Sequence, residues 1–79
     1  MEILIRREVP GGTRMDLADS SRVEMPQDGD GLISYPLKAV LEGPQATREE
    51  GDGRTIVVPV ARIIDLRTVP DGYEPRHRD

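Results

Sequence analysis

The 79-residue sequence contains no cysteine, no phenylalanine and no tryptophan, and each absence excludes something. Without cysteine the chain forms no disulfide and offers neither a thiolate metal ligand nor a thiol nucleophile. Tyr35 and Tyr73 are the only aromatic residues, so the core must be built from many small aliphatic side chains. We therefore expect a thin core of marginal stability, which the surface of a partner would readily complete.

Long apolar runs are also missing. No stretch approaches the roughly 18 apolar residues that a membrane-spanning helix needs, so we expect no contact with a membrane. Glu2 places an acidic residue where a secretory signal would carry basic residues followed by an apolar segment. Together with the lack of cysteine, these features favour a soluble protein of the cytoplasm.

Groups suited to catalysis or metal binding are scarce. His77, the single histidine, lies near the end of the sequence, where little would hold it in place as a general base. The alternation of Asp and Gly over 28–31 suggests a calcium loop, but Leu32 and Ile33 follow where an EF-hand loop needs an oxygen ligand and a glycine. We therefore expect no enzyme, no metal site and no cofactor, with a hydrolase that uses two loop carboxylates as the least favoured alternative.

Residues 54–69 form the most apolar part of the sequence, and we expect the rest of the chain to fold around them. β-Branched residues indicate a strand over 55–58, and Pro59, which has no N–H for a ladder, marks its end. Residues 60–62 are expected to make one tight turn before a second strand over 63–69. A helix that begins at Pro59 is the alternative.

The remaining strands are expected to form hairpins. Strands over 2–9 and 14–18 would flank a turn at Pro10–Thr13, in which two glycines can adopt positive φ. Residues 32–41 alternate over ten positions, which predicts one strand with a single apolar face made of Ile33, Tyr35, Leu37, Ala39 and Leu41. Short helices that begin at Thr13 or Pro36 are the alternatives.

These segments predict a mainly β fold, a small five-stranded SH3-like or partly open barrel with at most one short helical turn. The barrel would occupy residues 1–69, with another short strand at 22–25, a charged loop at 43–53 and a flexible tail at 70–79. Its core is expected to bury Ile56, Val58, Ile64 and Leu66, packed against Ile3, Ile5, Leu37 and Leu41.

Charge is unevenly distributed along the chain, whose net charge is −4. Residues 16–52 contain nine acidic and three basic residues, whereas residues 53–67 contain one acidic and three basic residues. Such acids can simply be solvated in loops, or they can form a negative face that seeks a basic partner. In the second case the predicted partner-binding residues are Asp28, Asp30, Glu42, Glu49, Glu50 and Asp52.

The same charge argues against direct binding of nucleic acid, which needs clustered Lys and Arg. The main hypothesis is therefore a non-enzymatic module that binds a protein with a basic surface. Its most specific form is a small phage or mobile-element inhibitor of the anti-CRISPR type, which occupies a nucleic-acid-binding channel. The alternative is a structural or assembly subunit, and a homodimer is expected because the thin core leaves Val57 and Val60 poorly covered.

Overall fold

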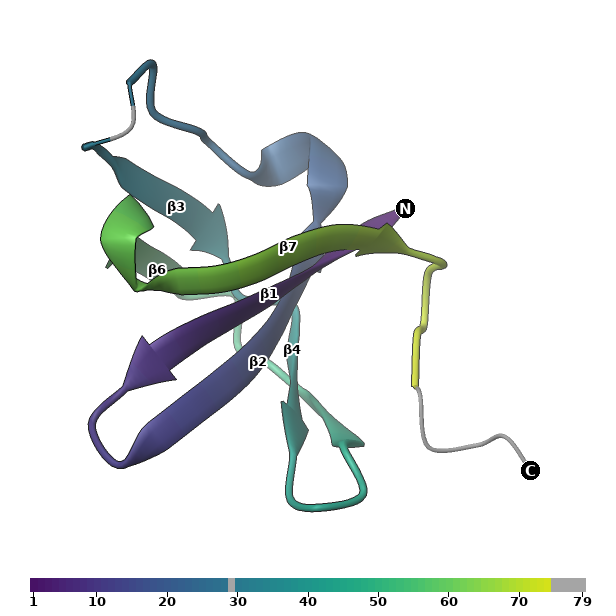
Figure 1. The fold of residues 1–79 in the computed structure, drawn as a ribbon. Coiled ribbons are helices and arrows are strands. Elements are labelled where there is room, and N and C mark those ends of the chain that lie inside the picture. The colour runs from purple at the N-terminus through teal and green to yellow at the C-terminus, as the bar shows by residue number, and fades with distance from the viewer. Residues whose placement is uncertain (29, 75–79) are drawn as a thin grey trace.

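Strands make up most of the described chain, residues 1–28 and 30–74 of a computed structural model (Figure 1). They are β1 (Glu2–Val9), β2 (Gly12–Asp19), β3 (Leu32–Pro36), β4 (Ala39–Glu42), β5 (Thr47–Glu50), β6 (Thr55–Pro59) and β7 (Ile63–Val69). Two single 3-10 turns, η1 (Ser20–Arg22) and η2 (Val60–Arg62), accompany them. The mainly β class is confirmed, with seven strands in these residues instead of the five expected, while closure into a barrel stays a prediction.

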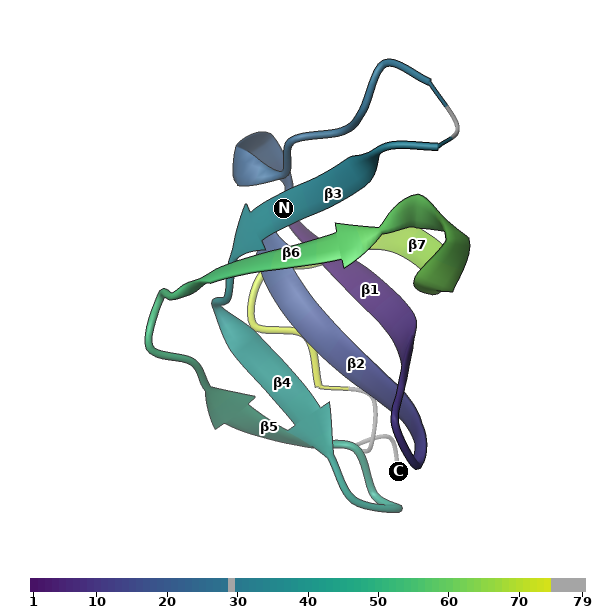
Figure 2. The same ribbon diagram turned by 90° about the vertical axis from the view of Figure 1, so that its left-hand side faces the viewer.

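The strands form two antiparallel layers. The larger sheet has the order β5-β4-β2-β1-β7, and β3 pairs with β6 in a separate two-stranded ribbon. This ribbon crosses one face of the larger sheet, as Figure 2 shows. The first hairpin is confirmed: Val9 pairs with Gly12, so Pro10 and Gly11 form its loop. None of the helices considered as alternatives is present in the described residues. These residues also contain no helix that is long and apolar enough to cross a membrane.

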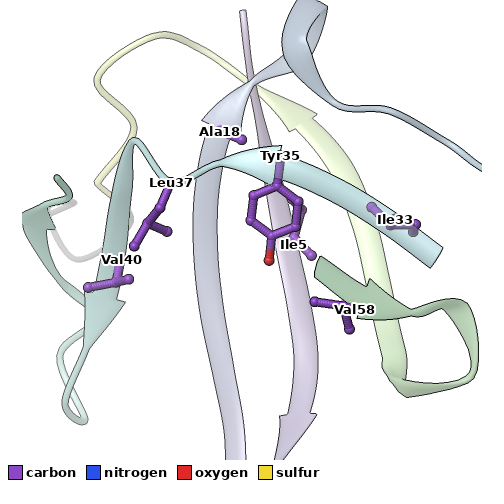
Figure 3. Close-up of a cluster of buried hydrophobic side chains, with 7 residues drawn as sticks. All are labelled: Ile5, Ala18, Ile33, Tyr35, Leu37, Val40 and Val58. Carbon is purple, nitrogen blue, oxygen red and sulfur yellow. The ribbon is translucent and has the colours of Figure 1, made fainter. Parts of the chain in front are cut away.

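Each face of the larger sheet carries its own core, while its edge strands β5 and β7 are largely exposed. The ribbon core lies between sheet and ribbon (Figure 3) and consists of Ile5, Ala18, Ile33, Tyr35, Leu37, Val40 and Val58. The rear core lies on the opposite face and consists of Leu4, Leu17, Ala39, Leu41 and Val69. Neighbouring residues of β1 and β2 can therefore both be buried, one in each core. A strand with only one buried face would instead alternate between buried and exposed residues.

The predicted strand over 32–41 is broken by a corner, so its prediction as one continuous strand was wrong. The N–H of Leu37 donates to the carbonyl of Arg54 at 2.8 Å, whereas the N–H of Lys38 donates to the carbonyl of Leu17 at 2.9 Å. Adjacent residues thus bond to different layers of the fold. As a result the predicted apolar face is divided: Ile33, Tyr35 and Leu37 enter the ribbon core, while Ala39 and Leu41 enter the rear core.

Two further expectations need correction. The predicted loop at 43–53 contains β5, which pairs with β4 even though its four residues carry three charges. The predicted strand at 22–25 is reduced to one bridge between Glu24 and Ser34, because η1 turns the chain immediately before it. Backbone pairing with β4 forms this strand, and no apolar pattern in the sequence indicates it.

The expected tight turn at 60–62 is confirmed as η2, but the burial of the next strand differs from the prediction. Val58 is buried, and Ile56 and Leu66 pack partly against the ribbon core. Ile64 is 46% exposed, so its predicted burial was wrong. The pairing of β1 with β7 shifts register between Arg6 and Arg7, and Ile64 is the residue left over at this bulge.

The described part of the predicted tail reaches the larger sheet, since Tyr73 packs against the rear core. Residues 75–79, which include His77, lie outside the described residues. The division of the chain into a domain and a flexible tail therefore stays a prediction.

The two isoleucines provide a direct test of this arrangement. Ile5→Ala should lower the free energy of unfolding by about 2–5 kcal/mol, because Ile5 is fully buried in the ribbon core. Ile64→Ala should lower it by less than about 1 kcal/mol, because the bulge leaves that side chain half in water. Urea unfolding of both variants measures the difference, and equal losses would contradict the bulge.

Candidate functional site

Four of the six predicted partner-binding acids gather around one shallow hollow beside β4 and β5. We call this the acidic hollow; its volume is about 370 Å³. Its lining residues are Arg14, Leu37, Val40, Glu42, Glu49, Glu50, Gly51, Asp52 and Arg54. Leu37 and Val40 are almost fully buried and supply the apolar part of this lining. The hollow thus has an apolar base and acidic residues around it, and its lining residues come from about half of the sequence.

The backbone around β5 brings these carboxylates together. Glu42 ends β4, Glu49 and Glu50 lie on the edge strand β5, and Asp52 follows in the connection to β6. Gly51 makes a close approach possible: its N–H donates to the carbonyl of Lys38 at 2.8 Å. A Cβ atom at this glycine would lie 2.7 Å from the carbonyl oxygen of Leu37, so a larger residue would push β5 away.

The four acidic residues that line the hollow differ in how much of their charge is available to a partner. Glu50 lies opposite Ala39 of the rear core, so its carboxylate projects to the other face of the sheet. Glu50 accepts a hydrogen bond from Arg48 Nε at 2.8 Å, and Asp52 accepts one from the N–H of Arg54 at 3.0 Å. Within the described residues Glu42 and Glu49 form no ion pair and are exposed. Glu42 and Glu49 are therefore the acids of the hollow best placed to meet a partner.

Asp28 and Asp30 are not part of this surface. They lie in the loop before β3, where Asp28 Oδ1 accepts a hydrogen bond from the N–H of Asp30 at 3.0 Å. Figures 1 and 2 both place this loop at the opposite end of the molecule from the β4–β5 hairpin. The six predicted residues are therefore divided between two separate regions.

Asp16, which contributes to the acidic count of residues 16–52, is fully buried. Its carboxylate accepts hydrogen bonds from Arg7 Nε at 3.0 Å, from Arg14 Nε at 3.2 Å and from the Tyr35 hydroxyl at 2.6 Å. Burial raises the pKa of Tyr35, and the hydrogen bond to the Asp16 carboxylate raises it further. This carboxylate belongs to the core and adds nothing to an acidic surface.

A second buried carboxylate, Glu2, lies on the opposite face of the sheet. Arg48 binds it with both terminal nitrogens, Nη1 to Oε1 at 3.0 Å and Nη2 to Oε2 at 3.1 Å. Lys38 Nζ lies 3.0 Å from Oε2, and the backbone of Gly72 supplies a further hydrogen bond. Arg48 Nη1 also donates to the carbonyl of Tyr73 at 3.3 Å. Glu2 thus connects β1 to the corner before β4, to β5 and to the segment after β7.

The electrostatics of Glu2 favour its charged form. Burial alone would raise its pKa, but the hydrogen bonds from Arg48, Lys38 and Gly72 outweigh burial and lower the pKa to about 2. The same contact with Glu2 raises the pKa of Arg48 and of Lys38. A carboxylate held this firmly in its ionised state is a poor proton acceptor, so we assign Glu2 a structural role.

Sequence reasoning missed both buried carboxylates. A signal was present in the alternation of the strands, since Glu2 has the same parity as Leu4 and Asp16 has the same parity as Ala18. This signal indicates burial only if one already knows that side chains cover both faces of β1 and β2. Among the described residues, no group of three histidine or acidic side chains is placed to hold a metal ion.

The outer face of the ribbon is a second candidate surface. It carries alternate residues of both strands, Leu32, Ser34 and Pro36 from β3 and Thr55, Val57 and Pro59 from β6. None of these six residues is charged, although a third of the chain is. Leu32 and Val57 are each 56% exposed and lie diagonally across the pair of strands. We call this surface the uncharged face.

No family model, no curated protein and no solved structure matches this chain. Function is therefore inferred from two surfaces, the acidic hollow and the uncharged face.

Replacing Glu2 tests the buried ion cluster. Glu2→Gln leaves Arg48 and Lys38 without their shared anion and should lower the free energy of unfolding by about 3–5 kcal/mol at neutral pH. Glu50→Gln is the matched control, because this carboxylate also contacts Arg48 but its side chain is 72% exposed. The control should cost less than about 1 kcal/mol in the same urea titration.

The cluster also predicts a pH dependence with a definite sign. Because the pKa of folded Glu2 is lowered from 4.5 to about 2, its contribution is present above pH 4.5 and is lost as the pH falls toward 2. The difference in stability between wild type and Glu2→Gln should therefore shrink over this range. A difference that stayed constant from pH 5 to about pH 2 would count against the low pKa.

Proposed function

We propose that this protein is a non-enzymatic binding module whose acidic hollow receives a basic side chain of a protein partner. The observation that carries the proposal is the placement of Glu42 and Glu49, exposed and without an ion pair in the described region, beside the apolar Leu37 and Val40. A lysine or arginine side chain has the matching chemistry, since its apolar stem can pack on such a base while its charged end meets the carboxylates.

The partner class follows from the charge. A surface rich in Lys and Arg is attracted over long distances by a chain with net charge −4, which speeds encounter and favours the correct orientation. Channels that bind nucleic acid have such surfaces, and a small acidic protein that occupies one acts as an inhibitor. An inhibitor of the anti-CRISPR type from a phage or mobile element is the most specific form of this proposal.

The uncharged face supports a second function, that of an assembly subunit. Two half-exposed aliphatic side chains, Leu32 and Val57, lie there among uncharged residues of β3 and β6, and the charged Glu24 borders the face only beyond the outer edge of β3. Contacts made by this face would depend little on salt, whereas those made by the acidic hollow would weaken steeply as salt is added.

A pair of matched variants separates specific use of the hollow from general acidity. Glu42→Gln with Glu49→Gln removes two charges from the hollow, and Asp28→Asn with Asp30→Asn removes two charges from the distant loop. With a fluorescent octa-arginine peptide as probe, the hollow variant should bind about three- to tenfold more weakly than wild type at low salt. The loop variant should bind nearly as well as wild type.

Both variants alter exposed side chains and should keep their free energy of unfolding within about 0.5 kcal/mol of wild type. Fluorescence anisotropy at low and at physiological salt measures the affinities. Equal weakening by the two variants would show that only net charge matters, and the acidic hollow would then lose its role.

A further inference from the structure

The backbone of β6 faces outward along one edge of the ribbon. Ser34 of β3 exchanges hydrogen bonds with Glu24, at 3.1 and 2.8 Å, and so faces away from β6. Hydrogen-bonded and non-hydrogen-bonded pairs alternate along an antiparallel ladder. Val57, which is opposite Ser34, and its alternate neighbours Thr55 and Pro59 therefore direct their backbone groups away from β3.

The other edges in the described part of the fold are less suited to pairing with a further strand. The outer edge of β3 is occupied by the bridge to Glu24. The edge strand β5 carries three charges, and the N–H of Arg48 in its middle donates to Glu74 at 3.4 Å. The edge strand β7 is interrupted by the bulge at Ile64. Charges and bulges of this kind are recognised means by which proteins protect sheet edges.

We propose that β6 pairs with β6 of a second copy of this chain, in an antiparallel register centred on Val57. In this register Val57 lies opposite Val57 of the other copy, and Thr55 lies opposite Pro59. Each Val57 N–H donates to the opposite Val57 carbonyl, and each Thr55 N–H donates to the opposite Pro59 carbonyl. Pro59 lacks an N–H, but this register asks it to contribute a carbonyl.

The uncharged strand β6 and the opposite charges beyond its two ends favour a second copy as the occupant. Two copies that each carry a net charge of −4 repel one another, and the five residues of β6 are uncharged, so their approach is least opposed there. Antiparallel pairing also brings the end of β6 that follows Asp52 beside the end that precedes Arg62 of the other copy. Both residues are exposed, so the pairing places opposite charges near each end of the shared edge.

The contact is small. Five residues of strand extend over about 17 Å, so the interface lies below the standard size for stable complexes. We therefore expect a weak dimer that dissociates on dilution. This inference shares Asp52 with the lining of the acidic hollow but does not require the hollow to bind a partner. It gives the uncharged face of the ribbon a specific role in assembly.

Sedimentation equilibrium from low micromolar to about millimolar protein tests the dimer. Wild type should shift from the mass of one chain, 8.8 kDa, toward twice that value as concentration rises. Val57→Lys should weaken association at least tenfold, because it places two like charges at the two-fold axis. Met25→Lys is the matched control, because it replaces an apolar residue of equal exposure next to Glu24, beyond the outer edge of β3, and should dimerise as wild type does.

Circular dichroism and thermal unfolding establish that each variant is folded before association is compared. A wild-type chain that stays monomeric at millimolar concentration overturns the proposal, as does dimerisation that Val57→Lys leaves unchanged.

A mixing experiment tests the two-fold register itself. Asp52→Arg and Arg62→Asp should each weaken self-association, since each homodimer then has two like-charged contacts. Mixed in equal amounts, the two variants should associate several-fold more strongly than either alone, because the mixed dimer again has opposite charges near both ends of the shared edge. Fluorescence energy transfer between labelled variants measures this recovery.

The mixed pair Asp28→Arg and Arg67→Asp is the control, since it changes net charge identically at positions outside the β6 edge. Equal recovery in the control, or no recovery in the Asp52 and Arg62 mixture, overturns the register.

Discussion

The carboxylate of Glu2 holds together parts of the chain that no hydrophobic contact alone would align. It lies at the start of β1 and is bound by Lys38 from the corner before β4 and by Arg48 from β5. The segment after β7 joins through the backbone of Gly72. A buried ion cluster adds little net stability compared with an apolar core of equal volume, but it penalises every arrangement in which one of its members is missing. In a core whose one large ring is Tyr35, this penalty adds specificity to that of the packing.

Asp16 performs the corresponding task on the other face of the same sheet. Arg7 and Arg14 lie directly opposite one another on neighbouring strands, where their like charges would repel. The carboxylate between them offsets this repulsion, and the hydroxyl of Tyr35 brings the ribbon into the same cluster. Each face of the sheet therefore combines an aliphatic core with one buried anion, and both anions are fully bonded.

The sequence predicted local features well where one physical cause dominates. The first hairpin, the break at Pro59 and the turn before β7 follow from glycine and proline geometry and were found. The corner at Leu37 and Lys38 was missed because the alternation of apolar residues continues through it without a break. The apolar residues before the corner enter the ribbon core, whereas those after it enter the rear core. Glu2 was missed because its bonding partners Lys38 and Arg48 lie far away along the chain. Asp16 was missed because its burial depends on the ribbon that covers it, from which Tyr35 donates a hydrogen bond.

The candidate site was predicted only in part, because its arrangement also depends on contacts between distant parts of the chain. Acidity placed the right residue type around β4 and β5, but the strand β5 itself has no apolar pattern that would have revealed how Glu42 and Glu49 meet. The separation of Asp28 and Asp30 from the hollow depends on the direction in which the loop before β3 leaves the fold. Such directions result from tertiary pairing and cannot be obtained from composition.

The position of β1 has a consequence for how the chain folds. This first strand pairs on one side with its immediate neighbour β2 and on the other side with β7, the last strand described. During synthesis the hairpin of β1 and β2 can form early, but the second edge of β1 stays open until residues 63–69 have emerged. Glu2, at the start of β1, likewise gains its last hydrogen bond only when Gly72 has emerged. Folding of this sheet is therefore completed only when β7 is available, and its completion closes a loop of more than fifty residues between β1 and β7.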